Sequence, residues 1–353
     1  MHYPDFSVPE GGQVTQVAEG VLWLRMPLPF DLNHINLYLL EDRHGWWIVD
    51  CGLGTDTARA HWEAITASLN KPIVGVIVTH MHPDHIGLAG WLCDEHRVPL
   101  YMSQTEYFAA RALLNGAAGA SRWQDELHFV RAGMNEDECR SLMGSGKGFG
   151  HVVSPVPVSY RRLKEGQTLT INQQQWQVMI GRGHSPEHVC LYCQERHILI
   201  AGDHILPEIS PNIGAYSTEP DAGSLADYLS TLTPFLHLPQ QTLVLPAHNR
   251  PFTGLHQRVH ALKDHHARHL ADLLEACTSP KTLKECLPVM FSRTLNPHNL
   301  GFAVAECQSH LNYLVEEEKM TRIRSTQGPD RYKTVRREIA DNQQDVPSDI
   351  VAD

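Results

Sequence analysis

His80-Met81-His82-Pro83-Asp84-His85 directly follows the apolar residues 74–78, and this stretch decides the fold class. An apolar run that ends in polar residues is typical of a buried strand followed by a loop, where a rigid scaffold can hold reactive groups. Imidazole and carboxylate groups are ligands for borderline and hard metal ions. Extended backbone would point His80 and His82 the same way, whereas Asp84 and His85 follow the strand-breaking Pro83. One short loop can therefore serve two metal ions.

Four further polar residues follow predicted strands elsewhere in the chain. They are Asp50 after residues 46–49, His184 after 176–180, Asp203 after 198–202 and His248 after 243–247. Each lies where an apolar run ends, which is the position of the 80–85 stretch as well. Five such positions in sequence order predict one sheet edge at which several strands bring metal ligands together.

This combination of motifs resembles the metallo-β-lactamase superfamily, in its glyoxalase II-like branch of dinuclear hydrolases. The motifs span residues 50–248, and the flanking strands extend the resemblance to about 20–255. The resemblance implies an α/β fold, a four-layer αββα sandwich with the site at one edge of its two sheets. It also implies two divalent metal ions. Zinc is the first expectation, and iron or manganese are alternatives because imidazole and carboxylate ligands suit all three.

The resemblance implies a role for each motif residue. The first ion would be bound by His80, His82 and His184, the second by Asp84, His85 and His248, and Asp203 would bridge the two. Asp50 would hydrogen-bond a ligand or the metal-bound water and orient it, and Asp84 would help to orient the attacking hydroxide. We therefore expect Asp50 and Asp84 to be catalytic. The family's zinc β-lactamases carry a cysteine where this chain has Asp203, which argues against antibiotic hydrolysis.

The implied reaction is hydrolysis of a small acyl substrate by a hydroxide that bridges the two ions. Metal charge lowers the pKa of water and stabilises the negative charge that develops on the substrate. A thioester suits this chemistry because a thiol, with a pKa of about 8.5, leaves with little help from an acid. A lactone is the other acyl candidate. Two alternatives stay open: a metal-dependent nuclease or phosphodiesterase, and a non-hydrolytic protein that holds redox-active iron or senses a ligand.

Composition favours a small-molecule substrate over a nucleic acid. The net charge is −11, whereas nucleic-acid-binding proteins usually carry a basic surface. No apolar run approaches the roughly 20 residues that cross a bilayer, and the start of the chain does not resemble a secretory signal. The eight cysteines are scattered, which predicts reduced, buried thiols. We therefore expect a cytoplasmic protein without membrane association, and a homo-oligomer is possible.

The chain divides into three predicted parts. Residues 1–255 form the catalytic domain, with a helical insertion at about 104–160 that ends in a glycine-rich stretch, 144–150. The insertion would cover the metal edge, or else serve as packing or a dimer contact. Residues 256–320 predict three helices that resemble a winged-helix-like module. Residues 321–353 are polar without an apolar period, and we expect a flexible tail.

A second histidine-rich stretch lies in the C-terminal part. Asp264-His265-His266 and His269 fall in a segment with helical spacing. The chain has 23 histidines, so that clusters also arise by chance. We expect this second cluster to be a solvated helix face.

Overall fold

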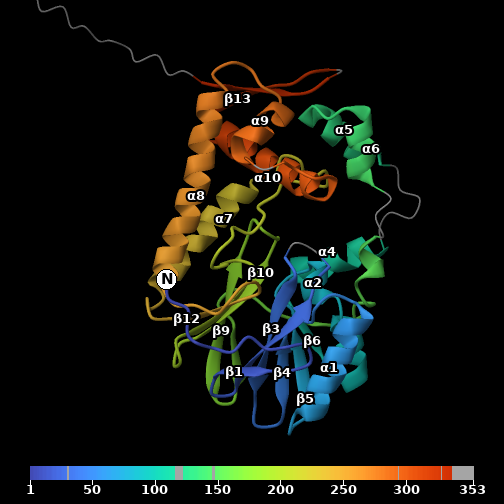
Figure 1. Ribbon diagram of the computed structural model, residues 1–353, viewed down its shortest axis with the longest axis vertical. Helices are drawn as coiled ribbons and strands as arrows, with labels where there is room; N and C mark the ends of the chain where they lie inside the picture. Colours follow the sequence, from blue (N-terminus) through green and yellow to red (C-terminus); the bar gives the residue numbers. More distant parts are fainter. Residues whose placement is uncertain (30–31, 116–121, 145–147, 293, 327, 336–353) are drawn as a thin grey trace, which may run out of the picture.

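The computed structural model describes residues 1–29, 32–115, 122–144, 148–292, 294–326 and 328–335. Two β-sheets pack face to face, and helices cover the outer face of each (Figure 1). The predicted α/β fold and its αββα layering are therefore confirmed. Part of the predicted glycine-rich stretch, residues 145–147, lies outside the described residues. No helix within the described ranges is long and apolar enough to cross a bilayer.

The first sheet has seven strands whose spatial order follows the chain. The first four pair antiparallel and the remaining pairs are parallel. The strands are β1 (Thr15–Ala18), β2 (Val21–Pro27), β3 (His34–Glu41), β4 (Trp46–Val49), β5 (Ile73–Ile77), β6 (Leu100–Met102) and β7 (Arg161–Arg162).

The second sheet has five strands in the order β12-β11-β10-β9-β8, and only the β11–β12 pair is parallel. The strands are β8 (Thr168–Ile171), β9 (Gln174–Gly181), β10 (His188–Cys193), β11 (Ile198–Gly202) and β12 (Leu243–Pro246). Side chains alternate between the two faces of a strand. Cys193 therefore packs between the sheets, whereas Cys190 packs on the outer face against helices. All eight cysteines are free and buried, as predicted.

Helices cover the outer face of each sheet. The first sheet packs against α1 (Asp56–Ser68), α2 (Pro83–Ile86), α3 (Ala89–His96) and α4 (Gln104–Asn115). The second packs against α7 (Ser224–Leu232), η2 (Thr233–His237) and the first half of α8 (Leu255–Ala276). Thr55 caps α1 by accepting a hydrogen bond from the amide of Ala58. The ring of Trp62 in α1 donates to the carbonyl of Cys51, the residue after Asp50.

The C-terminal helices form a module with its own core. The second half of α8 packs there with α9 (Leu283–Met290) and α10 (Pro297–Glu316). Two helices of the insertion, α5 (Trp123–Ala132) and α6 (Glu136–Met143), contribute to the same core (Figure 1). The short η1 (Phe149–His151) returns the chain to the sandwich. The insertion thus starts on the sandwich with α4 and extends into the C-terminal module.

The flexible tail predicted for residues 321–353 is wrong for its described part. A hairpin of β13 (Met320–Ile323) and β14 (Arg331–Thr334) continues the module. Tyr332 is only 2% exposed, and its hydroxyl accepts a hydrogen bond from Gln308 of α10. A single aromatic residue that packs on a distant helix leaves no periodic pattern in a short polar segment, so its burial was missed. Residues 336–353 lie outside the described residues.

The predicted solvated face of α8 is also wrong. His266 is fully buried, and His265 and His269 are partly buried. The face that carries these imidazoles packs toward α10, where His266 contacts His310. Helical spacing alone could not reveal that a second helix covers this face.

Candidate metal centre

The predicted ligands come together at one edge of the sandwich, where strands end. His80 and His82 follow β5, and the next residue, Pro83, starts α2, which carries Asp84 and His85. Proline suits the first turn of a helix because its missing amide hydrogen has no helical partner there. The other three residues follow strands of the second sheet: His184 after β9, Asp203 after β11 and His248 after β12.

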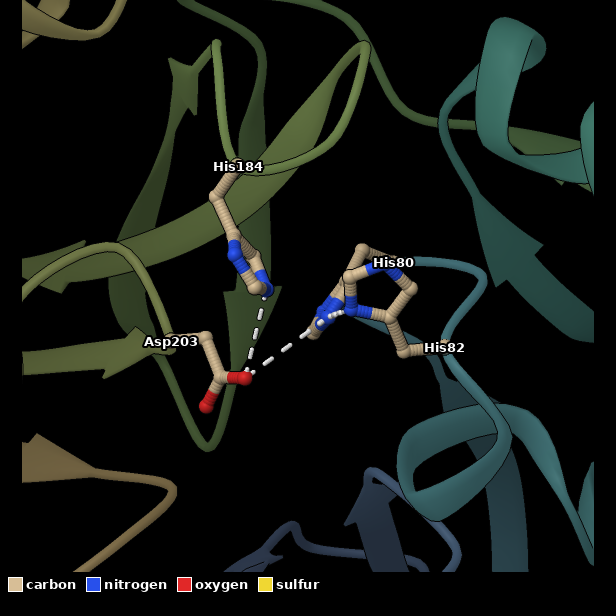
Figure 2. Close-up of side chains that lie close together, drawn as sticks. All are labelled: His80, His82, His184 and Asp203. Atoms are coloured by element: carbon tan, nitrogen blue, oxygen red, sulfur yellow. Dashed lines mark hydrogen bonds and ion pairs between the residues drawn. The ribbon is translucent and has the colours of Figure 1, made fainter. Parts of the chain in front are cut away.

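The first group consists of His80, His82, His184 and Asp203, whose side chains point toward one another (Figure 2). One ligand atom from each lies within 4.8 Å of the others. Asp203 Oδ2 lies 3.3 Å from His184 Nε2 and 3.9 Å from His80 Nε2. Three imidazoles and one carboxylate oxygen thus face a common point.

The second group consists of Asp84, His85 and His248, again within 4.8 Å of one another. Asp84 Oδ2 lies 3.8 Å from His85 Nε2 and 3.6 Å from His248 Nε2. Asp203 reaches this group too, with Oδ2 at 3.4 Å from His85 Nε2 and Oδ1 at 3.3 Å from His248 Nε2. Asp203 therefore lies between the two groups, at the place expected for a bridging ligand.

Hydrogen bonds on the outer nitrogens of His184 and His248 leave the Nε2 of each neutral ring available to a metal ion. His184 Nδ1 lies 2.8 Å from the carbonyl of Asn212, and His248 Nδ1 lies 2.9 Å from that of His34. A carbonyl oxygen only accepts, so that Nδ1 of each ring carries a proton, and in the neutral ring Nε2 carries a lone pair. Among the described residues, the buried Nε2 atoms of His85 and His184 have no hydrogen-bond partner. Such unsatisfied buried atoms cost free energy, and a bound cation would satisfy them.

Asp50 acts through its neighbours rather than at the centre itself. Its Oδ2 accepts hydrogen bonds from His85 Nδ1 and from the hydroxyl of Thr79, both at 2.8 Å. Its Oδ1 accepts the amide of Thr79 at 2.7 Å. A carboxylate on the outer nitrogen fixes the orientation of a ligating imidazole and increases its basicity. These contacts make Asp50 a positioning residue for His85, so the contacts match the first of the two roles expected for it.

The direction of the pKa shift divides the histidines of the site into two kinds. Burial lowers the pKa of His80 and His82 well below the usual range, and neighbouring imidazoles lower the pKa of both further. Burial also disfavours the imidazolium of His85, but the carboxylates of Asp50, Asp203 and Asp84 outweigh it and raise its pKa well above the usual range. The carboxylates thus concentrate negative charge around His85, which favours a cation at this position.

Glu106 is a residue of the site that the sequence did not reveal. It lies on α4, is fully buried, and joins the two loops that carry ligands. One carboxylate oxygen accepts the amide of Met81 at 2.9 Å, and the other accepts the amide of Glu187 at 2.7 Å. Burial raises its pKa, although the hydrogen bonds from Glu187, Ser185 and Met81 oppose this shift. A lone glutamate in a helical insertion gives no sequence signal for such a role.

His188 is the second residue that the sequence did not reveal. It is the first residue of β10, and its fully buried ring lies 4.7 Å from the ring of His80. Its Nε2 accepts the backbone amide of Asp203 at 3.0 Å. His188 therefore fixes the backbone at the residue that lies between the two groups.

Comparisons with known proteins agree with this geometry. A model described as the metallo-beta-lactamase superfamily matches residues 31–248, more than half of the chain. A second model, described as a metallo-beta-lactamase-like C-terminal domain, matches residues 270–335.

Two curated relatives and one solved structure illustrate the similarity. The chain is 24% identical over 328 residues to the probable metallo-hydrolase YqjP of Bacillus subtilis (strain 168), covering 86% of this chain and 95% of that protein. It is 25% identical over 246 residues to the acyl-coenzyme A thioesterase MBLAC2 of Gallus gallus, covering 67% of this chain and 80% of that protein. The crystal structure of a beta-lactamase domain protein from Burkholderia ambifaria is 39% identical with a TM-score of 0.88, covering 95% of this chain and 98% of that one. The chain therefore belongs to the metallo-β-lactamase superfamily, as a metallohydrolase-type enzyme that carries a C-terminal domain of the same family.

Proposed function

We propose that this enzyme hydrolyses a small acyl substrate, with a thioester as the first candidate and a lactone as the second. Two divalent ions, zinc by preference, would be held by His80, His82 and His184 on one side and by Asp84, His85 and His248 on the other. Asp203 would bridge them. One observation carries the proposal: two groups of ligand atoms, each within 4.8 Å, adjoin at Asp203 on one edge of the sheets. The site is that of the glyoxalase II-like, dinuclear branch of the family.

Two bound divalent ions would supply Lewis acidity and lower the pKa of water, so that hydroxide is available near neutral pH. The residues of the chain orient the ligands and leave the site accessible to a substrate. Asp50 and Thr79 hold the ring of His85, and Glu106 keeps the two ligand loops at a fixed separation. The side chain of Asp84 is 21% exposed, compared with 9% for Asp203. Asp84 is thus the carboxylate of the ligand set that can meet a substrate and orient the nucleophile.

A thioester is favoured by the leaving group and by one relative. A thiol with a pKa of about 8.5 leaves as thiolate with little acid assistance. The relative from Gallus gallus carries the name of an acyl-coenzyme A thioesterase, and its similarity covers 67% of this chain. The net charge of −11 favours a small substrate over a nucleic acid, which disfavours the nuclease alternative.

We also propose that residues 255–335 form a winged-helix-like module that shapes the substrate pocket or an oligomer contact. Three helices and a hairpin support this assignment. Residues 255–335 contain eleven lysines and arginines against nine aspartates and glutamates, a nearly even balance without the excess of positive charge that DNA binding requires. Free, buried cysteines fit a reducing compartment, and we propose the cytoplasm.

The test is thiol release from a panel of acyl-coenzyme A and glutathione thioesters, with the protein loaded with Zn²⁺ or Mn²⁺. We expect His82→Ala to lower the rate by about 10³-fold or more, because a site without this ligand stabilises the transition state poorly. Circular dichroism would check that the fold is retained. His44→Ala, which removes an exposed imidazole in the β3–β4 turn, is the matched control and should leave the rate unchanged.

Two results would contradict this proposal. Equal rates for His82→Ala and the wild type would remove the metal centre from the reaction. No release from any thioester, with two ions per chain measured, would exclude the thioester and direct the same assay to lactones and then to phosphodiesters.

A further inference from the structure

A second group of potential metal ligands lies at the contact between α8 and α10, outside the centre described above. His265 and His266 of α8 and Glu306 of α10 each offer one ligand atom, and these atoms lie within 4.8 Å of one another. His266 is fully buried, whereas His265 and Glu306 are partly buried. The group therefore has one fixed member and two side chains with room to move.

Hydrogen bonds determine which nitrogen of His266 carries a lone pair. His310 Nδ1 lies 2.8 Å from the carbonyl of Glu306 and must donate to it, because a carbonyl only accepts. With Nδ1 protonated, the Nε2 of the neutral His310 ring carries a lone pair. This Nε2 lies 3.1 Å from His266 Nδ1, which must therefore carry the proton. His266 Nε2 is left with a lone pair, 3.3 Å from the hydroxyl of Ser210.

A cavity of about 530 Å³ lies beside this group of residues. His265, Glu306 and Ser210 are among the residues that line it, so that two of the three potential ligands face open space. Four-coordinate zinc binds nitrogen at about 2.0–2.1 Å and oxygen at about 2.0–2.2 Å. The ligand atoms must therefore approach one another more closely than 4.8 Å, which the partly exposed His265 and Glu306 can do by rotamer changes. The cavity has room for a water as the fourth ligand.

We propose that His265, His266 and Glu306 form a third metal site, separate from the dinuclear centre, which takes a zinc-type divalent ion with water as its fourth ligand. Two neutral imidazoles and one carboxylate are a ligand set that zinc uses in proteins. The ion joins α8 to α10, which are also linked in this region by the hydrogen bond between His266 and His310 and by the ring contact between His269 and His310.

The third site has a short connection to the catalytic centre. Glu306 Oε2 accepts a hydrogen bond from the side chain of Asn212 at 3.2 Å. The carbonyl of the same Asn212 accepts the proton of His184 Nδ1 at 2.8 Å. An ion on Glu306 thus fixes the residue that orients a ligand of the first group. Occupancy of the third site stabilises the module and the position of His184 together.

The test is the number of zinc ions that remain bound after dialysis against micromolar Zn²⁺, measured by elemental analysis on the full chain. The wild type should bind one more ion per chain than either His265→Ala or Glu306→Gln. Glutamine keeps an oxygen that accepts from Asn212, so that Glu306→Gln retains the fold. The matched control is His260→Ala, which removes an exposed imidazole of α8 and should bind as many ions as the wild type.

The same comparison repeated in a His82→Ala background separates this site from the catalytic one. The difference of one ion should persist there, whatever the occupancy of the dinuclear centre. Equal zinc content in the wild type and both variants would overturn the third site. A loss confined to one of the two variants, or binding of the extra ion only at millimolar zinc, would overturn it as well.

Discussion

The molecule contains two clusters of histidines that look alike in sequence, residues 80–85 and 264–269, but their surroundings differ. In the first, the outer nitrogen of His85 contacts the carboxylate of Asp50, and that of His184, which joins this cluster in space, contacts the backbone carbonyl of Asn212. In the second, the outer nitrogen of His266 contacts another imidazole, His310. A carboxylate partner increases the basicity of a ligating imidazole, whereas a neutral imidazole does so weakly. We therefore expect that the partners of the outer nitrogens, rather than the density of histidines, set how strongly each cluster binds a metal ion.

Asp50→Asn would test whether a carboxylate on the outer nitrogen of a ligand matters for metal affinity. Among changes outside the ligand set, it should have the largest effect. The amide weakens the hydrogen bond to His85, and metal affinity of the catalytic centre should fall by about 10–100-fold. Competition with a chromophoric chelator would measure it. The third site should keep its affinity, because Asp50 does not contact it. Asp56→Asn, at an exposed position in the first turn of α1, is the control. An unchanged metal affinity in Asp50→Asn would contradict the role given to the carboxylate partner.

Glu106→Gln would test the link between the two ligand loops. A glutamine side chain has one accepting oxygen, so that it can serve the amide of Met81 or that of Glu187 but not both. We expect kcat to fall by about tenfold, because small misplacements of reacting groups slow the chemical step, with KM and metal content nearly unchanged. Steady-state kinetics on the best thioester would measure this split. Glu95→Gln on α3 is the exposed control, and a change in KM alone would contradict the positioning role.

The burial of the second cluster can be tested by the loss of folding stability at acidic pH, for which we expect the smallest effect. Burial lowers the pKa of His310 to about 3, and the ring faces the imidazoles of His265, His266 and His269 and the backbone carbonyl of Glu306. Since the unfolded ring has a pKa of about 6.5, unfolding takes up a proton below that pH. The stabilisation is therefore fully present above pH 6.5 and is lost as the pH falls toward 3. By pH 5.5 the loss from this residue is about 1.4 kcal/mol.

Urea unfolding at pH 7.5 and 5.5, with a chelator present, would measure this loss. His310→Gln should lose about 1 kcal/mol less than the wild type between the two pH values. His260→Gln, at an exposed position of α8, should lose as much as the wild type. Equal losses in all three proteins would show that the cluster is open to solvent when folded, as the sequence had led us to expect.

The residues of the metal centre could be predicted because each follows an apolar strand. Strand ends at one edge converge, so that position along the chain predicted proximity for Asp203 and His248, which lie far from residues 80–85 in sequence. The supporting residues could not be predicted in this way. Glu106 and His188 bind backbone amides across the fold, and nothing in their local sequence sets them apart.

By itself, the sequence determined the strands and the polar motifs at their ends, which depend on the alternation and length of apolar runs, local properties of the chain. The resemblance that these motifs carry then implied the sandwich and the set of metal ligands. Only the tertiary structure decided that α5 and α6 join the C-terminal module, that Tyr332 anchors a hairpin, and that His266 is buried. Each of these depends on a contact between segments that are distant in sequence, and packing against a distant partner leaves no periodic signal in either segment.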